Sequence, residues 1–591
     1  MKIQKNDRSR LIAAAMGRIP CDLTVKNIRL VNVFTGEIYP AEVDILDGSI
    51  VRVRQAGEKA PLESGGVYDG GGNFLIPGFI DTHVHIESSM MIPENFGRAV
   101  VCWGTTTVCT DPHEIGNVMG MDGIKFMLEN GRKTALRHLV LAPSCVPAVP
   151  GLESSGAVFK AGDIAEILDM DDVVGIAEIM DFVGVINDDE RIHDIIDEGI
   201  KRDMFLQGHA PHVGGKELAA YIIGGPKSDH ESTNAAEVRE KLRNGMHVNL
   251  RSSSIVDALK EQMDGISGQK WHDNVSICSD DIHAKDLLTS GNINSVIRKL
   301  VKNGLDPIEA IKMATINAAK EYKFDDLGAV APGYAADMQI VSSLDGEKPM
   351  AVFIGGRLVA ENGKYTAQDD ETPVDMPKNT VNMPQITSPD DFVLRAPEGC
   401  GDRARIRILT RNGGNTAIKE GRFVELPVKD GRVSIEDEPE LQFVCVANRY
   451  GTGDKNIAVM DCFDLKEGAM ATTVSHDSHN FTVFYRDEKS AYACAEHLKK
   501  VGGGMCAAKN GKVIGSLDLP AAGLMSLKDC EGVSGDIERM EEVFRDMCGK
   551  DFYLLMLVVF SLPVLPGLTL TDKGMIDGLT QTFVDMFDTS K

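Results

Sequence analysis

The chain has 591 residues, of which 43% are hydrophobic and 25% charged, so a globular protein of about two to four domains is expected. Its formal net charge of -26 argues against a nucleic-acid partner, because a polyanion is bound by a basic surface. The 12 cysteines include no CxxC pair, which excludes a disulfide framework and favours free thiols in a reducing cytoplasm.

The N-terminal region has the pattern of a small β-rich domain. Its first 23 residues lack a full apolar core with a cleavage site, so no signal peptide is predicted. Residues 21–72 alternate apolar and polar side chains, and Gly36 and Gly48 mark hairpin turns. A similar pattern returns over 334–365. We therefore predict a composite β-sandwich domain built from residues 1–74 and 325–367.

Between these two segments, residues 75–324 alternate strand and helix patterns, which is typical of parallel α/β structure. The segments 163–170 and 190–202 fit helices. Candidate strands cover 74–86, 104–111, 137–144, 172–180, 204–210, 226–232, 247–254 and 274–281. Eight strand–helix units in this length predict a TIM-type (β/α)8 barrel.

The last part of the chain is predicted to form a separate unit. Residues 368–391 carry four prolines among polar residues and read as a linker. Residues 392–591 mix strand and helix patterns, so a C-terminal α+β domain is expected. The apolar run 552–568 is too short for a membrane span and contains two prolines. We predict a buried strand followed by a turn there, and no membrane association.

Histidines and carboxylates stand at the ends of the predicted barrel strands. His83 and His85 lie two apart in an apolar strand, so both side chains point to the same face. In a TIM barrel the active site gathers at the carboxyl ends of the strands. The other strand-end candidates are Glu178, His209, His230 and Asp280. His212 is the alternative to His230, and Asp281 the alternative to Asp280.

This set of residues has the chemistry of a metal centre. Imidazole and carboxylate ligands suit divalent zinc, manganese or iron. Six ligands exceed the need of one tetrahedral cation, which suggests two cations with Glu178 between them. His83, His85 and Asp280 would hold one cation, and His209 and His230 the other. A hydroxide between two cations would form near neutral pH.

Longer segments resemble one family. The segment 71–120, with PGFIDTHVH and DPHEIGN, is similar to the bacterial adenine deaminases of the amidohydrolase superfamily. Further similar segments are GIAEIMDFVGVI, GHAPHVGG, SDHEST, CSDD, HDSHN and GGGMCAAKNGKVIGSLDLPAAGLMS. The resemblance implies hydrolysis of adenine to hypoxanthine and ammonia in purine salvage. It also implies two divalent metal ions, with manganese expected first and iron or zinc as alternatives, and a homo-oligomer.

The resemblance also bears on individual residues. Many relatives bridge their metals with a carbamylated lysine, whereas this chain has Glu178 at that position. The family likeness puts Asp111 and Glu114 near the substrate, as hydrogen-bonding or proton-transferring groups. The alternative for Asp111 is a helix N-cap followed by Pro112. Arg251 either binds substrate or forms a structural ion pair.

The expected mechanism is attack of the hydroxide on C6 of adenine. Asp280 would accept the hydroxide proton and pass it towards the leaving amine, and Glu114 would protonate a ring nitrogen. Two other functions are open: another binuclear amidohydrolase acting on a different cyclic amidine or amide, and a non-catalytic scaffold.

Three further residues have two interpretations each. His476 and His479 belong either to a second metal site or, as favoured, to a loop near a domain interface. Glu87 is either a partner of the site or a surface residue.

Overall fold

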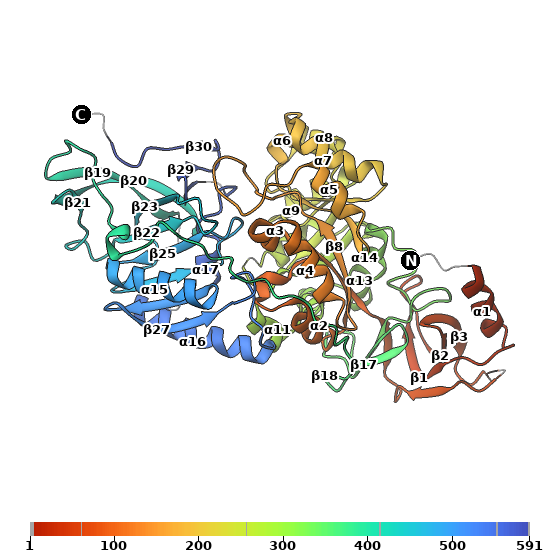
Figure 1. The fold of residues 1–591 in the computed structure, drawn as a ribbon. Helices are drawn as coiled ribbons and strands as arrows, with labels where there is room; N and C mark the ends of the chain where they lie inside the picture. The colour runs from red at the N-terminus through yellow and green to blue at the C-terminus, as the bar shows by residue number, and fades with distance from the viewer. Residues whose placement is uncertain are drawn as a thin grey trace.

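The protein is described by a computed structural model that covers residues 5–588, apart from 59, 61, 256, 413–414, 551–553 and 566. Three parts lie in a row (Figure 1). The strands near the N-terminus, drawn in red, lie at one end and the C-terminal third, drawn in cyan and blue, lies at the other. A parallel α/β body lies between them.

A mixed sheet at the N-terminal end joins distant segments of the chain. Its order is β18-β17-β16-β15-β5-β1-β2-β3, with β4 on β1. Helix α1 (Lys5–Ala15) precedes it, and the strands are β1 (Leu23–Val31), β2 (Ile38–Leu46), β3 (Ser49–Gln55), β4 (Gly66–Asp69), β5 (Phe74–Pro77), β15 (Met338–Val341), β16 (Ala351–Ile354), β17 (Arg357–Glu361) and β18 (Lys364–Tyr365). Because β15 pairs antiparallel with β5, both β-rich segments of the sequence contribute to this one sheet.

The central body is a TIM-type barrel of parallel strands. The sheets β10-β9-β8-β7-β6-β14 and β11-β12-β13 make up its wall. The strands are β6 (Phe79–His85), β7 (Thr105–Thr110), β8 (Arg137–Ala142), β9 (Val173–Ile179), β10 (Phe205–Gly208), β11 (Ser228–Asp229), β12 (His247–Arg251), β13 (Val275–Cys278) and β14 (Asp280–Asp281). Strand β14 continues β13 after Ser279 and pairs with β6. The two sheets also meet between β10 and β11. There the N–H of Lys227, one residue before β11, donates to the carbonyl of Leu206 on β10 at 2.9 Å.

Helices surround the barrel. They are η1 (Ile86–Ser89), α2 (Pro93–Val101), α3 (His113–Met119), α4 (Met121–Gly131), α5 (Ala161–Leu168), α6 (Phe182–Ile186), α7 (Glu190–Lys201), α8 (Gly215–Gly224), α9 (Ala235–Arg243), α10 (Leu259–Ile266), α11 (Ala284–Ser290), α12 (Ile293–Lys302), α13 (Pro307–Met313) and α14 (Ile316–Glu321). Helix α7 illustrates their origin. The Asp189 carboxylate caps its first turn, and Ile192, Ile195 and Ile196 face the core at helical spacing.

The structure agrees with most of the predicted barrel elements but divides the first strand. Each of the other seven predicted strands contains an observed strand, and the two predicted helices match α5 and α7 within two residues. Residues 74–86, predicted as one barrel strand, form β5 in the small sheet and β6 in the barrel. The break falls at Gly78, where an added Cβ would lie 2.3 Å from the Thr106 Oγ1 atom.

The C-terminal part is built on a second large sheet of order β21-β20-β19-β23-β22-β25-β24-β26-β27. Its strands are β19 (Arg403–Asn412), β20 (Asn415–Lys429), β21 (Arg432–Val433), β22 (Gln442–Ala447), β23 (Lys455–Met460), β24 (Ala469–Thr472), β25 (Phe481–Tyr485), β26 (Gly504–Lys509) and β27 (Lys512–Asp518). The other elements are η2 (Pro389–Phe392), α15 (Glu488–Val501), α16 (Cys530–Cys548), α17 (Leu555–Val558), β28 (Leu568–Thr571), β29 (Gly574–Asp577) and β30 (Thr582–Phe583).

The apolar run near the C-terminus differs from its prediction. The expected buried strand within 552–568 is wrong, because residues 555–558 form the short helix α17. Leu557, Val558 and Phe560 are fully buried in the core, so the expected burial is confirmed. Residues 552, 553 and 566 of this run lie outside the described part. Among the described residues, no helix has the length and apolar character to cross a bilayer.

Candidate active site

The six predicted metal ligands lie together at the carboxyl ends of the barrel strands. His83 and His85 are on β6, Glu178 is on β9 and Asp280 is on β14. His209 and His230 follow directly after β10 and β11. All are buried except His209, whose side chain is 15% exposed. These groups form overlapping clusters in which the possible ligand atoms lie within 4.8 Å of one another.

One half of the cluster combines two imidazoles and a carboxylate. The Nε2 atoms of His83 and His85 are 3.0 Å apart. The Asp280 Oδ1 atom lies 3.4 Å from His83 Nε2 and 3.2 Å from His85 Nε2. Three electron-pair donors facing one point without a proton donor between them fit a divalent cation.

The other half is arranged around Glu178. Its Oε2 atom lies 2.6 Å from His209 Nδ1 and 3.1 Å from His230 Nε2. Its Oε1 atom lies 3.5 Å from His85 Nε2, in the first half. The two oxygens of one carboxylate therefore face two groups of imidazoles, which is the geometry that a bridging ligand needs.

Hydrogen bonds on the far side orient the first two histidines. His83 Nδ1 lies 2.8 Å from the Gln207 Oε1 atom, and His85 Nδ1 lies 3.1 Å from the Asp111 carbonyl oxygen. Both partners are acceptors, so each Nδ1 carries the proton and each Nε2 keeps its lone pair for a cation. The sequence reasoning missed Gln207, although strand alternation puts it on the same face as His209.

The geometry separates both pairs of alternatives. The His212 side chain is 67% exposed and pairs with Glu237 at 2.9 Å, away from the cluster, whereas His230 is 1% exposed within it. Asp280 faces both histidines of β6. Asp281 instead accepts a hydrogen bond from Ser88 Oγ at 2.5 Å, although it also lies near His85.

The residues expected at the substrate side have close protein partners. Asp111 accepts the N–H of His113 at 3.0 Å, as a residue that starts a helix does, although Pro112 is the capping residue of α3. Its other oxygen lies 3.1 Å from His113 Nδ1. Arg251 Nη1 is 2.5 Å from Asp280 Oδ2 and also pairs with Glu231, so this guanidinium forms ion pairs inside the site.

Glu114 meets residues from the C-terminal part of the chain. Its Oε1 atom lies 2.5 Å from His476 Nδ1, and its Oε2 atom pairs with His479 Nε2. The HDSHN loop therefore lies at an interface, as favoured, and this interface includes the candidate residue Glu114. Asp477, also in this loop, and His113 join the same cluster. Sequence reasoning did not single out Asp477 and His113, because this cluster forms only where the two parts of the chain dock.

Burial and neighbouring charges set the ionisation of the site. Burial acts to raise the pKa of Glu178, but His209 and His230 hold it well below its usual value. Burial likewise acts to raise the pKa of Asp280, but Arg251, His83 and His85 together hold it well below its usual value. Glu87 is 2% exposed, so the surface interpretation is wrong. Burial, followed by the charge of Glu114, raises the pKa of Glu87 to about 7.

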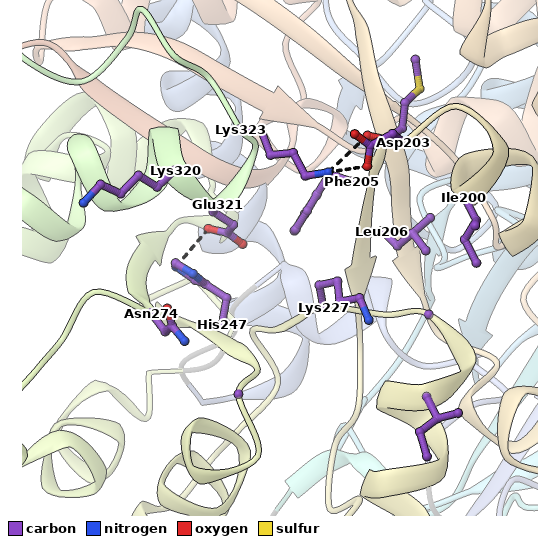
Figure 2. Close-up of a pocket in the computed structure, with 14 residues that line it drawn as sticks. Ile200, Asp203, Phe205, Leu206, Lys227, His247, Asn274, Lys320, Glu321 and Lys323 are labelled. Atoms are coloured by element: carbon purple, nitrogen blue, oxygen red, sulfur yellow. Dashed lines mark hydrogen bonds and ion pairs between the residues drawn. The ribbon is translucent and has the colours of Figure 1, made fainter.

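A cavity of about 570 Å³ lies at the opposite end of the barrel (Figure 2). Phe205 and His247 line it from the first residues of β10 and β12. Lys323 pairs with Asp203 at 2.6 Å there, and His247 lies 3.3 Å from Glu321. Because the ligand cluster stands at the carboxyl ends of the strands, this cavity is separate from it.

Comparison with known proteins agrees with this architecture. Residues 74–359 match the amidohydrolase family, and residues 416–582 match the adenine deaminase C-terminal domain. Adenine deaminase 2 of Carboxydothermus hydrogenoformans is 38% identical over 582 residues, covering 97% of this chain and 98% of that protein. Adenine deaminase of Kosmotoga olearia is 36% identical, covering 98% of each chain. Adenine deaminase of Clostridium acetobutylicum is 35% identical, covering 97% of this chain and 99% of that protein. The chain therefore belongs to the adenine deaminase family of amidohydrolases.

Proposed function

We propose that this protein hydrolyses adenine to hypoxanthine and ammonia, a reaction of purine salvage. One observation carries the proposal: the buried histidine–carboxylate cluster lies in a chain that is similar over its full length to proteins named adenine deaminases. Water supplies the oxygen that replaces the amino group at C6, and the amine leaves as ammonia.

The site is proposed to hold two divalent cations, manganese first, with iron and zinc as alternatives. His83, His85 and Asp280 would bind one cation, His209 and His230 the other, and Glu178 both. Imidazole and carboxylate ligands suit all three metals. When bound, the cations would lower the pKa of a water molecule so that it becomes a nucleophile near neutral pH.

Acidic side chains carry out the proton transfers of the reaction. Asp280 accepts the proton of the attacking water and returns it to the leaving amine. Its second oxygen is held by Arg251 at 2.5 Å, which keeps the carboxylate ionised and oriented. A proton passes through Glu114 to a ring nitrogen as the water adds, since an anionic purine is a poor place for negative charge, and Glu114 recovers a proton from the C6 hydroxyl group as the carbonyl forms. Asp111 and Arg251 stand beside these groups as substrate-binding candidates.

The alternative is another binuclear amidohydrolase acting on a different cyclic amidine or amide. The ligand cluster suits both reactions. The match of residues 416–582 to the adenine deaminase C-terminal domain favours adenine. A non-catalytic scaffold is less well supported, because each predicted ligand is present and buried or nearly so.

The organisation of the chain is part of the proposal. We infer a composite β-domain from 1–74 and 325–367, a barrel over 75–324 with β5 contributed to the small sheet, a linker over 368–391 and a C-terminal α+β domain over 392–591. We also infer a homo-oligomer and a reducing, cytoplasmic setting. The second inference is supported by the cysteines, all 12 of which are free.

The test is turnover of adenine by purified protein whose metal content has been measured. Manganese-loaded protein should release hypoxanthine and ammonia from adenine, and chelated protein should not. Adenosine serves as the control substrate and should stay intact. If protein with two metal ions per chain leaves adenine unchanged, adenine is the wrong substrate and other cyclic amidines and amides are tried next.

A further inference from the structure

A loop of the C-terminal domain, Ser475–Asn480, encloses the side chain of Glu114. Glu114 is 1% exposed, and each of its carboxylate oxygens faces an imidazole of this loop. His476 Nδ1 lies 2.5 Å from Oε1, and His479 Nε2 pairs with Oε2. Glu114 and His479 are 365 positions apart in the chain, so docking of the two domains creates this contact.

The loop is held by contacts that do not involve Glu114. The Ser475 hydroxyl lies 2.6 Å from the Ser561 hydroxyl, and the His476 N–H donates to the Val558 carbonyl at 2.8 Å. The buried Arg449 guanidinium donates to the His479 carbonyl at 3.3 Å. The imidazoles are therefore presented to Glu114 from a fixed backbone.

The hydrogen bonds assign the tautomer of His479. The Ser475 N–H donates to His479 Nδ1 at 3.1 Å, so Nδ1 is an acceptor and carries no proton. The neutral ring then carries its proton on Nε2, which faces Glu114 Oε2. Burial lowers the pKa of His479, which favours this neutral form. His479 is thus built to donate a hydrogen bond to the Glu114 carboxylate.

The barrel offers a more distant contact for the same carboxylate. His113 Nε2 lies 3.4 Å from Glu114 Oε1, while its Nδ1 atom lies 3.6 Å from Glu178 Oε1. His113 thus connects Glu114 to the metal-ligand cluster from the barrel side. The two loop histidines contact the same carboxylate, so groups from both domains surround it.

We propose that His476 and His479 are positioning residues for the deamination, which orient Glu114 for proton exchange with the purine ring. This inference rests on the proposed function. It assigns the C-terminal domain a part in the active site: the barrel supplies the metal ligands and Glu114, and the C-terminal loop sets the direction of the Glu114 carboxylate.

The same residues also suit a second role, as ligands of a metal ion, and the experiment must distinguish it from the positioning role. His113, Glu114, His476 and Asp477 offer ligand atoms within 4.8 Å of one another and could hold a further cation. In that case His476 would be a metal ligand, and its loss would lower the metal content. A positioning role leaves the metal content unchanged.

The experiment is a double-mutant cycle in the manganese-loaded full-length protein. Glu114→Gln, His479→Ala and the double variant are compared with wild type for kcat, KM, bound metal and melting temperature. Glu114→Gln should lower kcat about 10²–10⁴-fold, as expected for loss of a general acid–base group. His479→Ala should lower kcat about 10–100-fold, the size seen for groups that orient a ligand or catalytic residue. KM should change less than about threefold for both.

The double-mutant cycle shows whether His479 affects kcat through Glu114. If His479 acts through Glu114, adding His479→Ala to Glu114→Gln should lower kcat by no more than about a further twofold. His479→Gln should recover part of the activity, because its amide can still donate to Glu114. His476→Ala should also lower kcat without loss of metal. His497→Ala is the matched control in the same domain, since this partly exposed histidine pairs with Asp518 at 3.2 Å.

Each outcome of these measurements either supports the positioning role or overturns it. Multiplicative losses in the double variant, or loss of metal from His476→Ala, would overturn the inference while wild-type turnover leaves the proposed function intact. A metal-loaded wild type that does not turn over adenine overturns the proposed function, and the inference with it. Non-additive losses at unchanged metal content and melting temperature support the positioning role.

Discussion

At the scale of single residues, the site depends on carboxylates that burial alone would neutralise. Glu178, Asp280 and Glu114 are each buried, yet imidazoles or a guanidinium hold the pKa of each carboxyl well below its usual value. Buried negative charge without such partners is costly, so these neighbouring imidazoles and the guanidinium are what keep the three carboxylates ionised. The same physics explains why Arg251 lies beside Asp280 and Glu231.

The neighbouring carboxylates Asp280 and Asp281 allow a direct test of the proton acceptor. Asp280→Asn should lower kcat for adenine about 10²–10⁴-fold, because an amide cannot accept the proton of the attacking water. Bound metal, measured by elemental analysis, should remain. Asp281→Asn is the control: its amide oxygen can still accept from Ser88, and kcat should stay within about tenfold. A near-normal rate in Asp280→Asn, or a larger loss in Asp281→Asn, would contradict the assignment.

At the scale of elements, the boundary between the small sheet and the barrel depends on one glycine. Gly78 separates β5 from β6. Strand β5 pairs with β15 in the small sheet, whereas β6 belongs to the barrel and carries His83 and His85. An added Cβ at this position would lie 2.8 Å from the Cβ atom of Thr106 on β7. The close approach of the chain at this break to Thr106 of β7 therefore favours glycine here.

Gly78→Ala should lower the free energy of unfolding by about 1–3 kcal/mol, because the extra methyl group overpacks the contact with Thr106. The measurement is the midpoint of chemical denaturation. Gly162→Ala in α5 is the matched control, since an added Cβ there meets no atom within 4 Å. That change should be neutral or stabilising by up to about 1 kcal/mol. Equal midpoints for Gly78→Ala and wild type would show that the contact between residue 78 and Thr106 can accommodate a methyl group, which would contradict this account.

At the scale of the whole molecule, the C-terminal domain and the barrel share one hydrophobic cluster. It includes Met90 and Met91 of the barrel and Met525 and Val533 of the C-terminal domain. The Ser526 N–H donates to the Met90 carbonyl at 2.8 Å across the same contact. The shared core holds the HDSHN loop beside Glu114, so the proposed active site would draw on both domains.

Metal binding should also stabilise the whole barrel. The proposed ligands come from β6, β9 and β14 and from the ends of β10 and β11, so bound cations connect strands around the wall. Ligands that bind only the folded state raise its stability, by about 2.7 kcal/mol at a free concentration of 100 times Kd. Chelation should therefore lower the melting temperature, and added manganese should restore it. Glu178→Gln should respond much less to manganese. Identical melting curves with and without metal would contradict a shared site.

The sequence by itself determined the barrel, the family and the order of the six candidate ligands. The barrel and the ligand order follow from strand alternation and from the common end of parallel strands, whereas the family follows from the resemblance of longer segments. Gln207 was within reach of the same reasoning, since it stands two residues before His209.

Tertiary structure decided the remaining features, for physical reasons that no local pattern contains. The exposure of His212 and the burial of His230 depend on where the chain runs after each strand. The division of residues 74–86 depends on which neighbour each half pairs with, and periodicity is the same in both halves. The contact of Glu114 with His476 and His479 depends on the docking of two domains through a shared core, and docking surfaces leave no periodic trace in the sequence.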